Sequence, residues 1–147
     1  MGMDPSVTLF GPVDTYLAPV IGYVMLVLIA VNVVARGIEF DRIAAQAEQG
    51  AAAMSRHPLR VGTNFLLVVG AFYYLTVERH AGLIIALLVV TLFVTDFFEF
   101  EARKVEARQG LEIDRPWSAI GASSVALLYI AYQALFFLVK PYWSQVV

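Results

Sequence analysis

The chain contains four long stretches in which apolar residues follow one another with almost no charged residue between them. A helix needs about 20 such residues to cross a bilayer, and each stretch is close to that length. Apolar and polar residues do not alternate along these stretches, as they would in a membrane barrel, so the pattern predicts helices. The four predicted spans are residues 17–35, 59–77, 82–100 and 117–139.

The composition agrees with this pattern. Of the 147 residues, 60% are hydrophobic and 15% are charged, whereas about a quarter of the residues in a soluble domain are charged. The length suits a single domain, 1–147, with no room for a second one. We therefore predict an all-α membrane protein whose four transmembrane helices form an up-down-up-down bundle. The short turn at 78–82 makes the second and third helices antiparallel neighbours.

The basic residues indicate which way the bundle faces. Eight of the ten Lys and Arg residues lie in or beside the two segments that follow the first and third spans. Positive residues mark the cytoplasmic side of a membrane protein. We therefore predict a multi-pass plasma-membrane protein with both termini extracellular and both longer loops cytoplasmic. The eight basic residues are Arg36, Arg42, Arg56, Arg60, Arg103, Lys104, Arg108 and Arg115.

Two of the helices are expected to continue past the apolar stretches into the cytoplasm. The third span runs without proline into the charged sequence EARKVEAR, and Gly110 offers a C-terminal cap. A helix from Gly82 to Gln109 would be about 42 Å long, more than the roughly 30 Å of the hydrocarbon core. The segment 36–55 after the first span is also rich in helix-forming residues, with a break expected at Gly50.

The end of the third span holds the main candidate site. Asp96, Glu99, Arg103 and Glu106 are separated by three, four and three residues, so they share one face of the helix. Carboxylates at the membrane edge need partners, and basic residues and amides at the inner ends of the first two helices can supply them. The expected partners in this polar interhelical seam are Arg36, Arg60, Asn32 and Asn64, with Arg56 as a further candidate.

The seam has two interpretations. As a structural layer, its ion pairs and amide hydrogen bonds would fix how the four helices pack. As a functional site, Asp96 and Glu99 would form the cytoplasmic mouth of a path for protons or cations. No series of acidic residues continues from Asp96 through the deeper parts of the spans. We therefore favour the structural interpretation and keep the second one as the alternative.

Few residues of the chain indicate a metal site, a cofactor site or a nucleic-acid-binding site. The chain lacks cysteine, and its two histidines, His57 and His80, lie on opposite sides in the predicted topology, so they cannot share a haem or a zinc ion. A metal site of His57, Asp96 and Glu99 would suit iron or manganese by ligand type, but the Glu-x-x-His pairing of di-iron bundles is missing. No phosphate-binding glycine loop and no dense basic cluster for nucleic acid occurs. We expect no enzyme activity, no cofactor, no metal and no nucleic-acid partner.

Two further features concern partners and the N-terminus. Ser118 with Ala122, and Ala119 with Ser123, form small-xxx-small pairs that favour close helix contact, within the chain or between subunits. The first six residues, MGMDPS, match the pattern for N-myristoylation. We favour another interpretation, in which Met1 and Gly2 precede a native start at Met3.

Three segments together resemble a known family: DPSVTLFGPVDT at 4–15, SRHPLRVGTNFLLVVGAFYYLTVERHAG at 55–82, and TDFFEFEARKVEARQGLEIDRP at 95–116. They are similar to an uncharacterised family of small four-span membrane proteins from haloarchaea. The resemblance implies an archaeal plasma membrane and a setting of high salt. It supplies no activity, cofactor or catalytic residue.

The sequence thus predicts a non-enzymatic integral membrane protein that acts as a homo-oligomeric scaffold or as an accessory subunit of a membrane complex. Its expected partners are the lipid bilayer and either further copies of itself or other membrane subunits. The alternative is a small ion channel or proton-coupled transporter that uses Asp96 and Glu99 at its cytoplasmic mouth.

Overall fold

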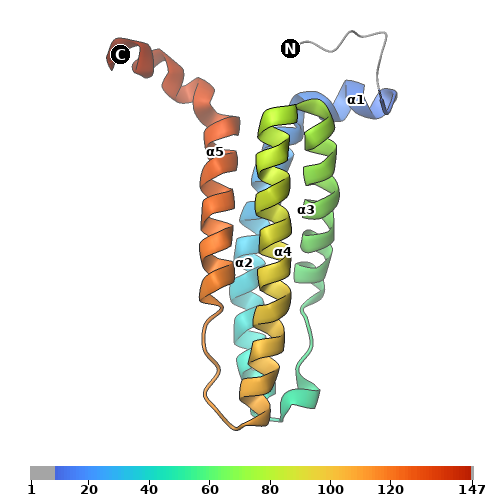
Figure 1. Ribbon diagram of the computed structural model, residues 1–147, viewed down its shortest axis with the longest axis vertical. Coiled ribbons are helices and arrows are strands. Elements are labelled where there is room, and N and C mark those ends of the chain that lie inside the picture. The colour runs from blue at the N-terminus through green and yellow to red at the C-terminus, as the bar shows by residue number, and fades with distance from the viewer. Residues whose placement is uncertain (1–8, 147) are drawn as a thin grey trace.

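The computed structural model describes residues 9–146, and every regular element within this range is helical. Four helices in this range are long and apolar enough to cross a membrane, and they run alternately down and up in Figure 1. The N-terminal myristoylation pattern lies outside the described residues. The α-helices are α1 (Pro12–Leu17), α2 (Ile21–Ala47), α3 (Pro58–Val77), α4 (Arg79–Arg108) and α5 (Trp117–Val146).

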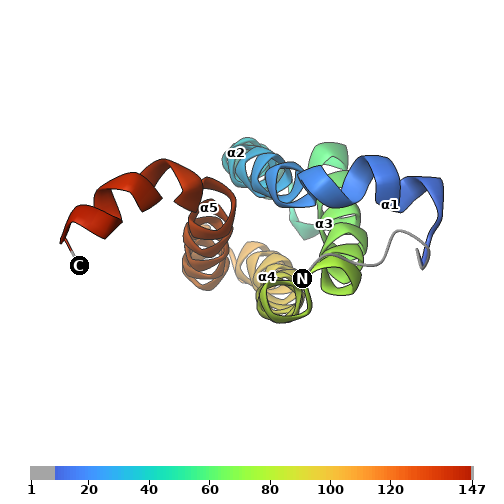
Figure 2. The same cartoon turned by 90° about the horizontal axis from the view of Figure 1, so that it is seen from above.

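The four long helices form a closed bundle. Helix α2 packs against α3 and α5, and α4 packs against the same two helices, so the four helices occupy the corners of a four-sided arrangement in Figure 2. Helix α1 lies across one end of the bundle and joins α2 through a short 3₁₀ turn, Ala18–Val20. The inner faces of the four long helices therefore meet along one central axis.

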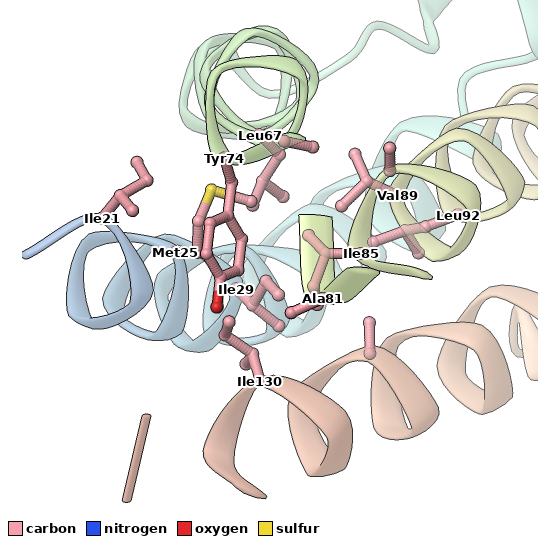
Figure 3. Packing of buried hydrophobic residues seen from close by; sticks show 13 residues of the cluster. Ile21, Met25, Ile29, Leu67, Tyr74, Ala81, Ile85, Val89, Leu92 and Ile130 are labelled. Carbon is pink, nitrogen blue, oxygen red and sulfur yellow. The ribbon is translucent and has the colours of Figure 1, made fainter. Parts of the chain in front are cut away.

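Apolar side chains fill the centre of the bundle and also cover its outside. Met25, Ile29, Ile85 and Ile130 are fully buried, and Figure 3 shows how side chains of α2, α3, α4 and α5 meet there. Large apolar side chains also point outward, and Leu128 is 72% exposed. A helix that is apolar on both its inner and outer faces is typical of a lipid-facing bundle. The outer surface therefore supports the membrane class predicted from the sequence.

The turn between α3 and α4 is tighter than the sequence suggests. The predicted turn covers 78–82, but α4 already begins at Arg79, so Glu78 alone separates the two helices. Gly82 explains this close approach, because a Cβ atom at this position would lie 2.4 Å from the Cα atom of Leu75. Only glycine lets the first turn of α4 pack directly on the last turn of α3.

At the opposite end, α2 and α4 extend beyond the predicted apolar spans, to Ala47 and Arg108. Gly50 (φ +105°) and Gly110 (φ +68°) follow these helix ends in left-handed backbone conformations. A second small apolar cluster, formed by Ile43, Met54 and Phe100, holds the two extensions and the α2–α3 connection together. The connection contains only a short 3₁₀ turn, Ala51–Ala53, and is otherwise irregular up to α3.

Two features shape the end of the bundle that carries α1. The carboxylate of Asp14 accepts hydrogen bonds from the Phe10 N–H (2.9 Å) and from the Tyr73 hydroxyl (2.8 Å), which fastens α1 to α3. Helix α5 bends away from the bundle near its C-terminal end in Figure 1. Pro141 lies within this part of α5, and its ring removes a helical N–H and crowds the carbonyl of Phe137.

Candidate functional site

Asp96 is the centre of a buried polar cluster that joins α2, α3 and α4. Its Oδ1 atom accepts hydrogen bonds from Arg36 Nη1 (3.0 Å) and from Arg60 Nη2. Its Oδ2 atom accepts from Arg56 Nη1 (2.7 Å) and from Asn64 Nδ2 (3.0 Å). A carboxylate can accept about four hydrogen bonds, so the acceptor capacity of Asp96 is used completely by side chains of this chain.

Arg60 links Asp96 to two residues of α2. It is 0% exposed, and its Nη1 atom donates to Asn32 Oδ1 (2.5 Å) and to the Asn32 carbonyl (3.3 Å). Its Nε atom lies 3.5 Å from Glu39 Oε1. The other oxygen of Glu39 accepts the backbone N–H of His57 (2.7 Å). Glu39 thus balances part of the charge of Arg60 and also anchors the start of α3.

An amide layer completes the contact between α2 and α3. Asn32 Nδ2 donates to Asn64 Oδ1 (2.8 Å) and to Thr63 Oγ1 (2.7 Å). Because Asn64 in turn donates to Asp96, the layer is continuous with the ionic contacts. We call the whole set the Asp96 cluster, and its members are Asn32, Arg36, Glu39, Arg56, Arg60, Thr63, Asn64 and Asp96.

Glu99 and Arg103 form a separate group further along α4. Arg103 Nη2 lies 3.5 Å from Glu99 Oε2, and its Nε atom lies 2.9 Å from Glu106 Oε2. Its Nη1 atom donates to the carbonyl of Asp114, which fixes the α4–α5 connection to α4. Within residues 9–146, no ion pair joins this group to the Asp96 cluster, but Glu99 and Arg103 line a small cavity together with Arg36, Glu39 and Asp96. Glu99 is about 4.5 Å further along the helix than Asp96.

The Asp96 cluster contains more positive than negative charge. Its three arginines, Arg36, Arg56 and Arg60, face only two carboxylates, Glu39 and Asp96. In addition, Arg36 Nε and Nη2 are buried without a hydrogen-bond partner in the described part of the chain. The cluster therefore has one excess positive charge and an excess of N–H donors.

The family described as a domain of unknown function, DUF7313, matches residues 4–147. The chain belongs to the DUF7313 family. No curated protein and no solved structure matches the chain. All members of the Asp96 cluster lie within the part of the chain that matches the DUF7313 family.

In this DUF7313 protein the polar groups of the cluster mainly contact one another. Both carboxylate oxygens of Asp96 are occupied by donors from α2, α3 and the α2–α3 connection. Within the described residues, no group of three or more His, Cys, Asp or Glu side chains could hold a metal ion. His57 is used locally, because its Nδ1 atom accepts the N–H of Leu59 (3.2 Å) at the start of α3.

Most members of the Asp96 cluster were expected from the sequence, and two were not. Asp96 lies among Arg36, Arg60 and Asn64, as the helical spacing predicts, and Asn32 joins them through Arg60. Glu39 and Thr63 were missed. The spacing Asn32–Arg36–Glu39 is four and three residues, so the same rule that found the α4 face would have found Glu39. Thr63 precedes Asn64 and has no such signal, because adjacent helical residues point in different directions.

Proposed function

We propose that the chain is a non-enzymatic integral membrane protein that acts as a homo-oligomeric scaffold or as an accessory subunit of a membrane complex. The arrangement of Asp96 supports this proposal most directly. A group that transfers protons or binds substrate needs a free acceptor or a free donor. The four donors on Asp96 instead connect three elements of the same chain, as expected of a residue that fixes helix packing.

The proposal includes an orientation in the membrane. Eight of the ten basic residues are located in or near the end of the bundle that contains the α2–α3 and α4–α5 connections. By the positive-inside rule this end faces the cytoplasm, and α1 and the C-terminal end of α5 face outward. The extensions of α2 and α4 would then form a charged cytoplasmic platform. The sequence resemblance adds an archaeal plasma membrane as the setting.

The assembly part of the proposal is supported by surface available for contact with other subunits. Helix α5 packs against α2 and α4 on one side only, and large apolar residues such as Val125, Leu128 and Tyr132 are more than half exposed on its other side. Lipid can cover such a surface, and so can a sister subunit or an unlike membrane chain. A scaffold or accessory subunit would use this surface and the cytoplasmic platform together.

Native mass spectrometry of the protein extracted gently from its own membranes tests the assembly directly. We expect a discrete mass that contains either several copies of the 16.2 kDa chain or one copy with unlike chains. A bare monomer, recovered under conditions that preserve known membrane complexes from the same extract, would contradict the proposal.

A flux assay separates the proposed role from the alternative, a channel or proton-coupled transporter. The double variant Asp96→Asn/Glu99→Gln is reconstituted in vesicles next to the parent protein. A packing role predicts a lower Tm with ion and proton flux equal to that of protein-free vesicles for both proteins. Flux that is present in the parent and absent from a folded double variant would instead establish transport.

A further inference from the structure

An apolar groove runs along the outside of the bundle between α3 and α4. It has a volume of about 450 Å³, and its walls include Val61 and Phe65 of α3 and Phe93 and Phe97 of α4. Phe65 is 67% exposed and Phe97 is 52% exposed, so the groove is open to the surroundings of the bundle. It belongs to the size class of small-molecule sites in proteins.

One end of this groove is cationic. Arg56, from the α2–α3 connection, lines it together with Asn64. The guanidinium group of Arg56 lies 4.7 Å from the centroid of the Phe100 ring, and Lys104 Nζ lies 4.7 Å from the same centroid. Ser55, next to Arg56, accepts a hydrogen bond from Arg42 (2.9 Å). The apolar groove therefore leads to a set of basic side chains at the end of α3.

The net positive charge of the neighbouring Asp96 cluster adds to the cationic character of this end of the groove. The cluster has three arginines and two carboxylates, and Arg56 is its most accessible cation. The side chain of Arg56 is 22% exposed, compared with 8% for Arg36 and 0% for Arg60. Lys104 is partly neutralised by Glu101 at 3.4 Å. Nη1 and Nη2 of Arg56 each donate to Asp96, and its partly exposed guanidinium is the part of this net-positive cluster that lies at the end of the groove.

We propose that this groove binds one anionic phospholipid, with an acyl chain along α3 and α4 and the phosphate group beside Arg56 and Lys104. The groove spans Val61 to Val68 on α3, a rise of about 10 Å, which matches a segment of an extended hydrocarbon chain. Arginine forms strong charge-assisted hydrogen bonds with phosphate oxygens. The phosphate would also balance the excess charge of the Asp96 cluster. This site is independent of the oligomeric state proposed above.

The test compares two lipids that share acyl chains and differ in headgroup charge. The full-length protein is delipidated, incubated with phosphatidylglycerol or phosphatidylcholine micelles, and analysed by native mass spectrometry. We expect one retained phosphatidylglycerol, with an apparent affinity about tenfold higher than for phosphatidylcholine, as for one charge-assisted contact. Equal retention of both lipids would overturn the proposal, because it would indicate ordinary annular lipid.

Two matched pairs of variants locate the site. Val61 and Val69 both lie on α3 and are 50% and 51% exposed, but only Val61 lines the groove. Val61→Trp should abolish the retained lipid, and Val69→Trp should leave it unchanged. Lys104→Gln should remove most of the preference for phosphatidylglycerol, whereas Lys140→Gln, near the other end of the bundle, should not. Equal behaviour within either pair would overturn the assignment to this groove.

Two controls keep the result specific. Circular dichroism of each variant verifies the helical fold, and because Lys104 lies outside the Asp96 cluster, Lys104→Gln tests the headgroup contact even if Val61→Trp fails to fold. Inorganic phosphate at the same concentration distinguishes a lipid from a free anion. We expect it neither to be retained nor to compete with phosphatidylglycerol, and retained or competing phosphate would overturn the lipid proposal.

Discussion

At the scale of single residues, the described structure is organised around one carboxylate. Asp96 is 5% exposed and accepts hydrogen bonds from three arginines and one asparagine. Removing one partner of a buried ionic group is strongly destabilising, because the remaining charges stay buried without compensation. Substitutions within the Asp96 cluster should therefore affect stability much more than substitutions of exposed charges on the same helix.

We predict that Asp96→Asn lowers the free energy of unfolding by about 3–5 kcal/mol, because three arginines lose their shared counter-ion. Thermal unfolding in detergent, followed by circular dichroism, measures the effect. Glu101→Gln is the control, since Glu101 lies on the same helix with a side chain that is 45% exposed. Its loss should change stability by about 0.5 kcal/mol or less. Similar values for the two variants would contradict a structural role for Asp96.

A variant of Glu39 separates the effect of net charge on stability from the effect of the hydrogen bonds that Asp96 accepts. Glu39→Gln removes the same unit of negative charge as Asp96→Asn, but the amide oxygen can still accept the His57 N–H, and only the 3.5 Å ion pair with Arg60 is lost. We expect a smaller loss of stability, about 1–2 kcal/mol. The two variants are compared in the same unfolding experiment. An equal loss would mean that net charge, and not the hydrogen bonds of Asp96, determines the stability of the cluster.

At the scale of elements, the helices are joined by connections of very different length. One residue, Glu78, separates α3 from α4, whereas the α2–α3 connection is irregular over most of 48–57. The tight turn depends on the backbone contact at Gly82. The longer connection depends on side-chain contacts, since Arg56 reaches Asp96 and the His57 N–H reaches Glu39.

We predict that Gly82→Ala destabilises the bundle by about 1–3 kcal/mol, because the new methyl group would overlap the backbone of Leu75 and the helices would have to move apart. Gly62→Ala is the matched control, because a Cβ atom at Gly62 meets nothing within 4 Å. This control should be neutral or stabilising by up to about 1 kcal/mol. The Tm values of the two variants test this prediction. An unchanged Tm for Gly82→Ala would show that the turn tolerates a wider spacing of the two helices.

At the scale of the whole molecule, the bundle has two unlike ends. One end contains α1 and the C-terminal part of α5, and the other contains the two longer connections and most of the basic residues. The outer surface between these ends is largely apolar. This distribution is the physical basis of the proposed orientation, because charged connections and an apolar belt must match the water and hydrocarbon layers of a bilayer.

The orientation can be tested with single cysteines, because the chain has none of its own. We expect Ser144→Cys, in the exposed end of α5, to react with a membrane-impermeant maleimide in intact cells. We expect Glu112→Cys, in the exposed α4–α5 connection, to react only after the membrane is opened. Labelling of both variants in detergent is the control. The reverse pattern would overturn the proposed sidedness and leave the fold unaffected.

Much of the fold follows from the order of residues alone. The predicted spans each lie largely within one of the four long helices, and the extension of the third span to about Gly110 corresponds to the end of α4 at Arg108. These features are local, since the hydrogen bonds of a helix join residues four apart. The 78–82 turn was predicted too long, because the close approach at Gly82 depends on a contact with Leu75 in the neighbouring helix.

The sequence by itself determined the four long helices and the face of α4 on which Asp96 lies, because backbone satisfaction in an apolar medium and the helical repeat are properties of consecutive residues. The tertiary structure decided how these groups pair. It brought Thr63 of α3 and Arg56 of the irregular α2–α3 connection into direct contact with the cluster, and it paired Glu99 with Arg103 of the same helix. These contacts depend on the relative height of neighbouring helices and on the path of an irregular connection, and no periodicity along the chain encodes either.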